Sequence, residues 1–127
     1  MAKKILLVDD AEFMREMLEE MLDPSEYEII EHVTTGREAI NTYRKLMEEG
    51  NRPDIVAIDI VLPEIDGITV IREIKKLDPN AKIFVISALS APGPINESIE
   101  AGASDYIIKP FTTKKLIKTL ENLLKER

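Results

Sequence analysis

The chain alternates five short apolar runs with five amphipathic stretches, and this alternation limits the folds that it can adopt. The runs are rich in isoleucine and valine and lie at residues 4–8, 28–33, 54–59, 82–87 and 105–108. Their length and their lack of polar alternation are typical of strands that are covered on both faces. Because strands that alternate with helices form parallel sheets, the pattern predicts an α/β fold with helices on both faces of one parallel sheet.

Four of the five intervening stretches carry apolar residues at the spacing of an amphipathic helix, and a proline follows each of the first three. The stretch at residues 90–101 differs, because Pro92 and Pro94 fall in its first turn. Proline is best tolerated at the first helical position. We therefore expect a short helix there that begins near Pro94.

Composition restricts the class of protein. A length of 127 residues predicts one domain over residues 1–127, and no apolar run is long enough to span a membrane. The basic start lacks the apolar core of a signal peptide, so we expect a cytoplasmic protein with no membrane insertion. The net charge of −7 argues against nucleic acid as a direct partner, and the lack of cysteine excludes disulfides and thiolate metal sites.

Polar residues collect where the predicted strands end. Asp9 and Asp10 follow the first run, Asp59 ends the third, Ser87 ends the fourth and Lys109 follows the fifth. Parallel sheets bind their ligands beyond the carboxyl ends of the strands. If the strands are neighbours, three carboxylates, a hydroxyl and an ammonium group meet at one edge of the sheet.

Such a group of residues suits phosphoryl transfer. Like charges at close range repel one another, and Mg²⁺ bound by Asp10 and Asp59 would relieve that repulsion. A carboxylate can attack phosphorus, and the transition state needs charge neutralisation more than acid–base catalysis. Lys109 and Ser87 would supply it, which leaves Asp59 as the group to be phosphorylated.

Each residue also has a simpler interpretation when it is taken alone. Asp9, Asp10 and Ser87 are common types at turns and helix caps, Asp59 is as well explained by a cap, and Lys109 precedes a proline in what is usually a turn. The simple interpretations do not predict that four strand ends carry compatible groups. That agreement favours the functional interpretation.

Four segments carry a resemblance to a known family: VDDAEFMR at 8–15, DIVAIDIVLPEIDG at 54–67, SAL at 87–89 and AGASDYIIKPF at 101–111. With this spacing the chain resembles the response-regulator receiver family, and its CheY-like chemotaxis branch in particular. The resemblance implies a flavodoxin-like (βα)5 fold with strand order 2-1-3-4-5. It also implies Mg²⁺ dependence and phosphorylation by a partner histidine kinase.

The resemblance assigns a metal site and a phosphorylation site. Asp59 would be the phosphoacceptor and a ligand of Mg²⁺. Asp10 would bind Mg²⁺ directly, Asp9 would act through a water molecule, and Val61 would contribute its backbone carbonyl.

It also assigns the residues that respond to the phosphoryl group. Ser87 and Lys109 would hold that group, and the peptide bond between Lys109 and Pro110 would be cis. Tyr106 matches the aromatic switch residue of the family, which turns inward when the hydroxyl residue is drawn to the phosphate.

The expected function is a two-component signalling switch, and three rival functions stand beside it. The leading expectation is a monomer that catalyses only its own phosphorylation and dephosphorylation. It would change the face built by the fourth helix, the fifth strand and the fifth helix, and so bind a chemotaxis target such as a motor or adaptor component. The rivals are a stand-alone phosphorelay intermediate, a small phosphatase with an Asp nucleophile, and an interaction domain that is never phosphorylated. Val61 stands where such a phosphatase needs a second Asp, and the intact set of Asp10, Asp59, Ser87 and Lys109 argues against the interaction domain.

The sequence departs from the chemotaxis branch in two places. The first is the pair Val61 and Leu89, since polar residues are common at these positions in that branch. Both residues flank the path of a water that attacks the phosphoryl group, and apolar side chains cannot orient that water. We therefore expect slow self-dephosphorylation. The second departure, Ala91-Pro92-Gly93-Pro94, alters the start of the fourth helix and so the expected output face.

Three further features have a plainer interpretation. His32 is expected to be a half-exposed sheet residue. Of Phe13 and Met14, one is expected in the core, and the other either packs there too or contacts the kinase. The basic group of Lys114, Lys115 and Lys118 is expected to be a solvated face, with a border of the output surface as the alternative.

Overall fold

Five parallel strands form one sheet in the order β2-β1-β3-β4-β5 in the computed structural model, which describes residues 1–125. The strands are β1 (Lys3–Val8), β2 (Tyr27–Val33), β3 (Ile55–Ile58), β4 (Ile83–Ser87) and β5 (Asp105–Ile108). The order and the parallel pairing confirm the predicted fold class.

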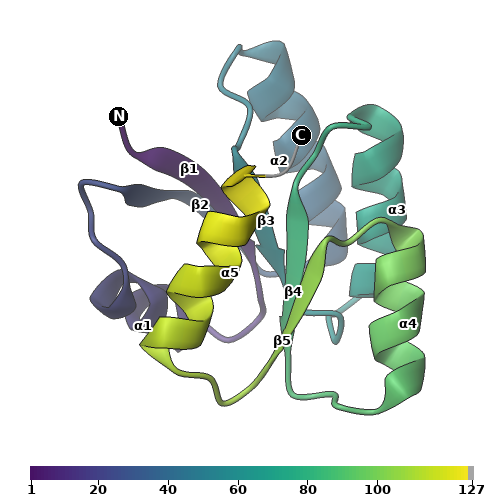
Figure 1. Cartoon of the computed structure of the whole chain (residues 1–127). Helices are drawn as coiled ribbons and strands as arrows, with labels where there is room; N and C mark the ends of the chain where they lie inside the picture. The colour runs from purple at the N-terminus through teal and green to yellow at the C-terminus, as the bar shows by residue number, and fades with distance from the viewer. Residues whose placement is uncertain (126–127) are drawn as a thin grey trace.

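Helices cover both faces of the sheet (Figure 1). They are α1 (Phe13–Met21), α2 (Gly36–Glu48), α3 (Gly67–Leu77), α4 (Pro92–Ala101) and α5 (Thr113–Lys125). Helices α1 and α5 pack on one face, while α2, α3 and α4 pack on the other. No helix in the described part of the chain is long and apolar enough to cross a membrane.

The core lies in two layers, one on each side of the sheet. Successive side chains of a strand point to opposite faces. In β1, Leu6 and Val8 therefore join the layer under α2, α3 and α4, whereas Ile5 and Leu7 join the layer under α1 and α5. Every residue of β3 is buried. Burial on both faces explains why these strands have continuous apolar sequences.

Local signals set the helix starts. The side chain of Thr35 accepts a hydrogen bond from the backbone N–H of Glu38 at the start of α2, and Asp66 accepts one from Thr69 at the start of α3.

Helix α4 begins at Pro92 and not near Pro94, so that expectation was wrong. The N–H groups of the first helical turn have no partner within the helix, and a proline there gives up no hydrogen bond. The first turn of α4 therefore accommodates both prolines.

Candidate functional site

The strand order brings the predicted site residues to one edge of the sheet. Because β1 pairs with β3 and β3 pairs with β4, Asp9, Asp59 and Ser87 leave the carboxyl ends of three adjacent strands. Strand β5 pairs with β4 and delivers Lys109 to the same edge, where its backbone N–H donates to the carbonyl of Ser87 at 2.8 Å.

Two carboxylates share the ammonium group of Lys109. Its Nζ lies 2.9 Å from Oδ2 of Asp9 and 3.0 Å from Oδ2 of Asp59. The second oxygen of each carboxylate is held by a backbone N–H of its own loop, from Ala11 at 2.9 Å and from Val61 at 3.0 Å. The two aspartates are thus bound alike, by one cation and one peptide donor each.

Exposure distinguishes the two carboxylates. The side chain of Asp9 is 1% exposed and that of Asp59 is 11% exposed. A group that must meet an incoming phosphoryl donor has to be reached from solvent. Of the pair, only Asp59 meets that requirement, while Asp9 lies behind it as a fixed negative charge.

The charge of Lys109 is stabilised by the pair. Burial by itself lowers the pKa of a lysine, but the hydrogen bonds and negative charges of Asp9 and Asp59 outweigh burial and raise the pKa of Lys109. The ammonium group therefore stays protonated next to both carboxylates. The peptide bond between Lys109 and Pro110 is cis, as predicted.

Asp10 does not join the pair. It is exposed, and Lys109 contacts only the other two aspartates. Within residues 1–125 no three His, Cys, Asp or Glu side chains lie close enough together to form a metal cluster. The structure therefore brings Asp9 and Asp59 together but leaves the third carboxylate at the rim.

The donor chemistry of this edge nevertheless fits Mg²⁺. The carboxylates of Asp9 and Asp59 offer oxygen ligands and share a single positive charge, that of Lys109. Mg²⁺ needs only one or two protein carboxylates because it keeps several of its waters. The exposure of Asp10 leaves room for such waters.

Ser87 and Tyr106 both contact Leu89, in the loop after β4. Ser87 is fully buried, and its Oγ accepts a hydrogen bond from the N–H of Leu89 at 3.3 Å. The hydroxyl of Tyr106 donates to the carbonyl of Leu89 at 2.6 Å. Burial and the charge of Asp59 raise the pKa of Tyr106 against the opposing effect of the Ser87 hydroxyl. One loop residue, Leu89, thus connects the buried hydroxyl with the aromatic ring.

Close packing fixes the loop after Asp59. The N–H of Gly67 donates to the carbonyl of Ile60 at 2.9 Å, and a Cβ on Gly67 would lie 2.5 Å from the carbonyl oxygen of Asp59. Only glycine fits there. Sequence analysis did not identify Gly67 as a site residue, although the Asp66-Gly67 pair at a helix start was a visible signal.

Several secondary expectations can be compared with their positions. Met14 is buried and Phe13 is 65% exposed, so one of that pair packs in the core and the other does not. Val61 and Leu89 are both exposed beside the site. His32 is half-buried in β2, as expected, but its Nε2 lies 2.8 Å from the carbonyl oxygen of Asp9, a contact that the sequence did not suggest.

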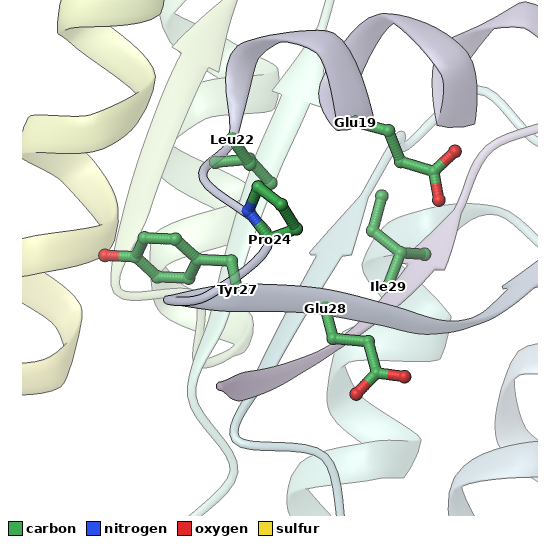
Figure 2. A pocket seen from close by; sticks show the side chains of 6 residues that line it. All are labelled: Glu19, Leu22, Pro24, Tyr27, Glu28 and Ile29. Atoms are coloured by element: carbon green, nitrogen blue, oxygen red, sulfur yellow. The ribbon is translucent and has the colours of Figure 1, made fainter. Parts of the chain in front are cut away.

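A hollow of about 170 Å³ between α1 and β2 lies away from these residues (Figure 2). Glu19, Leu22, Pro24, Tyr27, Glu28 and Ile29 line it. None of them is a predicted site residue, and the groups that contact Lys109 are absent from its lining. The hollow therefore plays no part in the chemistry described above.

Comparison with known proteins connects this geometry to a family. Residues 5–121 match the model of the response regulator receiver domain. The chain is 45% identical to the chemotaxis protein CheY of Thermotoga maritima over 125 residues, which cover 98% of this chain and 100% of that protein.

Solved structures of CheY and of receiver domains have the same fold as this chain. The CheX–CheY–BeF3–Mg²⁺ complex from Borrelia burgdorferi contains a chain with a TM-score of 0.89 and 29% identity, with 98% of this chain and 90% of that chain covered. The receiver domain of a sensor histidine kinase from Pseudomonas aeruginosa has a TM-score of 0.84, 26% identity and coverage of 99% and 100%. That domain has a magnesium ion coordinated in its active-site cleft. The chain therefore belongs to the response-regulator receiver family.

Proposed function

We propose that Asp59 is the phosphoacceptor of this receiver domain and that its phosphorylation by a histidine kinase switches the chain into a partner-binding state. The family is one of phosphorylation-dependent signalling switches in two-component systems. The observation that carries the assignment is the different exposure of two carboxylates that share Lys109. Asp59 is the one of the two that solvent reaches.

The proposed reaction is an in-line transfer. An oxygen of Asp59 attacks phosphorus, the bond from phosphorus to the donor breaks, and the donor keeps the bonding electrons. The product is an acyl phosphate on Asp59. Lys109 lies within hydrogen-bond distance of Oδ2 of Asp59, so its charge can follow the negative phosphoryl oxygens as they arrive. Ser87 would hold a further oxygen.

The residues proposed to hold Mg²⁺ are Asp10, Asp59 and the backbone carbonyl of Val61, with Asp9 acting through a water molecule. When bound, the ion supplies charge neutralisation at the phosphoryl oxygens. The positive charge of Lys109 offsets the negative charge of Asp9 beside the ion, because Lys109 Nζ lies 2.9 Å from Asp9 Oδ2.

The signal would pass from the phosphoryl group to α4, β5 and α5. Phosphorylation adds about −1.5 to −2 charge at pH 7. Ser87 would exchange its hydrogen bond with Leu89 for one with the phosphoryl group. The loop at Leu89 and the Tyr106 hydroxyl bound to it would then shift together. This biases an equilibrium between two arrangements of the face, and a partner that binds one arrangement senses the phosphoryl group.

The expected partners are a chemotaxis-type histidine kinase and a downstream motor or adaptor component. A hollow beside Lys109 offers a place for the kinase, because the exposed Phe13 lines it together with Met17 and Phe111. The chemotaxis assignment is supported by the CheY relatives. We further propose that the protein is a cytoplasmic monomer. It would catalyse only its own phosphorylation and dephosphorylation.

Incubation with acetyl phosphate tests the proposal. The wild-type protein should gain one phosphoryl mass in the presence of Mg²⁺ and none after chelation with EDTA. Asp59→Asn, which keeps the shape of the side chain, should gain none in either condition. Phosphorylation of Asp59→Asn to the wild-type extent would contradict the assignment.

The rival functions give different results. A phosphorelay intermediate would pass its phosphoryl group to a histidine protein in phosphotransfer profiling, and a switch would not. A small phosphatase would turn over a phosphomonoester many times. Turnover is not expected here, because Val61 occupies the place of the second acid that such enzymes use.

A further inference from the structure

The single histidine of the chain reaches the acidic edge from the neighbouring strand. His32 lies near the end of β2 and is paired in register with Leu7 of β1. Its Nε2 lies 2.8 Å from the backbone carbonyl oxygen of Asp9. None of the roles considered so far uses this contact.

The chemistry of the two atoms defines the direction of the bond. A carbonyl oxygen can only accept a hydrogen bond, so Nε2 of His32 must carry a hydrogen and donate it. His32 also lines an open hollow together with Glu12, Phe13, Arg15, Glu16 and Glu19. Water can therefore reach the region around the ring while Nε2 is committed to Asp9.

The contact with His32 gives the last polar group of Asp9 a hydrogen-bond partner. The N–H of Asp9 donates to the carbonyl of Val33 at 3.1 Å, and its carboxylate takes bonds from Ala11 and Lys109. The carbonyl of Asp9 was the remaining polar group, and His32 binds it. Every polar group of this buried residue thus has a partner.

The peptide that His32 holds is the one that joins Asp9 to Asp10. Because a peptide unit is planar and rigid, fixing its carbonyl oxygen also fixes the direction in which the chain enters Asp10. Asp10 is exposed and lacks the contact with Lys109 that anchors Asp9 and Asp59. The orientation of its carboxylate therefore depends on the backbone that precedes it.

We propose that His32 is a positioning residue for the Mg²⁺ site. Through its Nε2–H bond to the Asp9 carbonyl, it preorganises the peptide that carries Asp10 and so strengthens cation binding. The inference rests on the proposed function, since it assumes that Asp10 is a ligand of Mg²⁺. Partners of metal ligands commonly tune affinity in this way.

A pair of substitutions separates hydrogen bonding from packing. His32→Leu removes the donor and keeps an apolar side chain of similar size, whereas His32→Gln keeps an N–H donor at a similar reach. Ile30→Val, a conservative change in the same strand, is the control. The dissociation constant for Mg²⁺ is read without phosphorylation, from the amide shift of Ala11 in an NMR titration.

We expect His32→Leu to bind Mg²⁺ about threefold to tenfold more weakly than wild type, which is the effect of losing one hydrogen bond. His32→Gln and Ile30→Val should stay within about twofold of wild type. Thermal unfolding without Mg²⁺ shows how far each variant is destabilised. Unchanged Mg²⁺ affinity in a folded His32→Leu, or an equal loss in His32→Leu and His32→Gln, would overturn the proposal.

A spectroscopic measurement tests the bond itself. Because the chain has one histidine, ¹⁵N signals from labelled imidazole belong to His32 alone. Neutral His32 should show the hydrogen on Nε2, and a hydrogen on Nδ1 would overturn the inference. Failure of the proposed function looks different, since wild type itself would then fail to bind Mg²⁺ or remain unphosphorylated, whichever residue stands at position 32.

Discussion

Two buried aspartates at opposite ends of the sheet are bound by different sets of partners. Asp59 lies at the carboxyl end of β3, and Asp78 follows α3 at the amino end of β4. Asp59 is 8% exposed and Asp78 is 6% exposed, so burial does not distinguish them. The two residues differ in the groups that bind their carboxylates.

Asp78 has partners of its own. Its Oδ2 accepts from the hydroxyl of the fully buried Tyr43 at 2.6 Å and from Arg52 at 2.7 Å, and its Oδ1 accepts from the N–H of Asn80 at 3.0 Å. Burial and this bond raise the pKa of Tyr43, which keeps the hydroxyl protonated as a donor. The network joins α2, the loop before β3 and the end of α3.

Asp59, by contrast, shares its cation with Asp9. One ammonium group balances two carboxylates, so negative charge is left over at the edge that solvent reaches. An excess of buried negative charge destabilises a fold, but it attracts a cation. The comparison shows that Asp78 has a cation of its own, whereas Asp9 and Asp59 share one, and of these two Asp59 is the more exposed.

The largest effect should come from the structural end. Asp78→Asn removes the charge that Tyr43 and Arg52 bind, so the free energy of unfolding should fall by about 2–3 kcal/mol. Chemical denaturation measures this. The folded protein should still be phosphorylated by acetyl phosphate, and loss of phosphorylation in folded Asp78→Asn would break the comparison.

The contribution of Asp78 to the free energy of unfolding should depend on pH. Burial favours a raised pKa, but the hydrogen bonds from Tyr43, Arg52 and Asn80 outweigh it and lower the pKa of Asp78. A carboxyl group whose pKa is lowered by folding stabilises the fold fully above its unfolded pKa of about 3.9, and that stability is lost as the pH falls through the lower folded value.

The difference in unfolding free energy between wild type and Asp78→Asn should therefore shrink as the pH is lowered below about 4. Denaturation series at several pH values measure it. A difference that stays constant down to acid pH would show that the charge of Asp78 does not matter.

Tyr43→Phe should have a smaller effect of the same kind. It removes one donor to Asp78 but leaves Arg52 and the N–H of Asn80 in place, so we expect a loss of about 1–2 kcal/mol. Denaturation of the double variant with Asp78→Asn sharpens the test, because the two losses should be less than additive.

The smallest effect is expected at the reactive end. Val61→Asn and Leu89→Glu place polar groups beside Asp59, where they can orient an attacking water. We expect dephosphorylation about threefold to tenfold faster, with stability unchanged. A phosphate-release assay measures the rate, and a rate equal to that of wild type would reject the explanation for slow self-dephosphorylation.

The sequence was sufficient to predict which strand ends bring polar groups together, but not the network around Asp78. Asp59, Ser87 and Lys109 each follow an apolar strand, and a parallel sheet collects strand ends at one edge, so their meeting could be predicted. Asp78 has no sequence signal beyond its place before Pro79, one of the prolines that follow the first three helical stretches. Its partners Tyr43 and Arg52 lie 35 and 26 positions away along the chain, and no local pattern connects them.

Two details of the reactive end were also beyond the sequence. The equal position of Asp9 and Asp59 around Lys109, with Asp10 outside, depends on side-chain directions that spacing does not define. The bond from His32 to Asp9 depends on the register of β2 against β1, which shifts between Ile5 and Leu6. Such contacts require the folded backbone.

The site of phosphorylation tests the central claim most directly. After reaction with acetyl phosphate and Mg²⁺, borohydride reduces an aspartyl phosphate to homoserine, and mass spectrometry of peptides locates the change. The account predicts homoserine at residue 59 and unmodified aspartate at residues 9, 10 and 78. Modification of any of those three in place of Asp59 would contradict it.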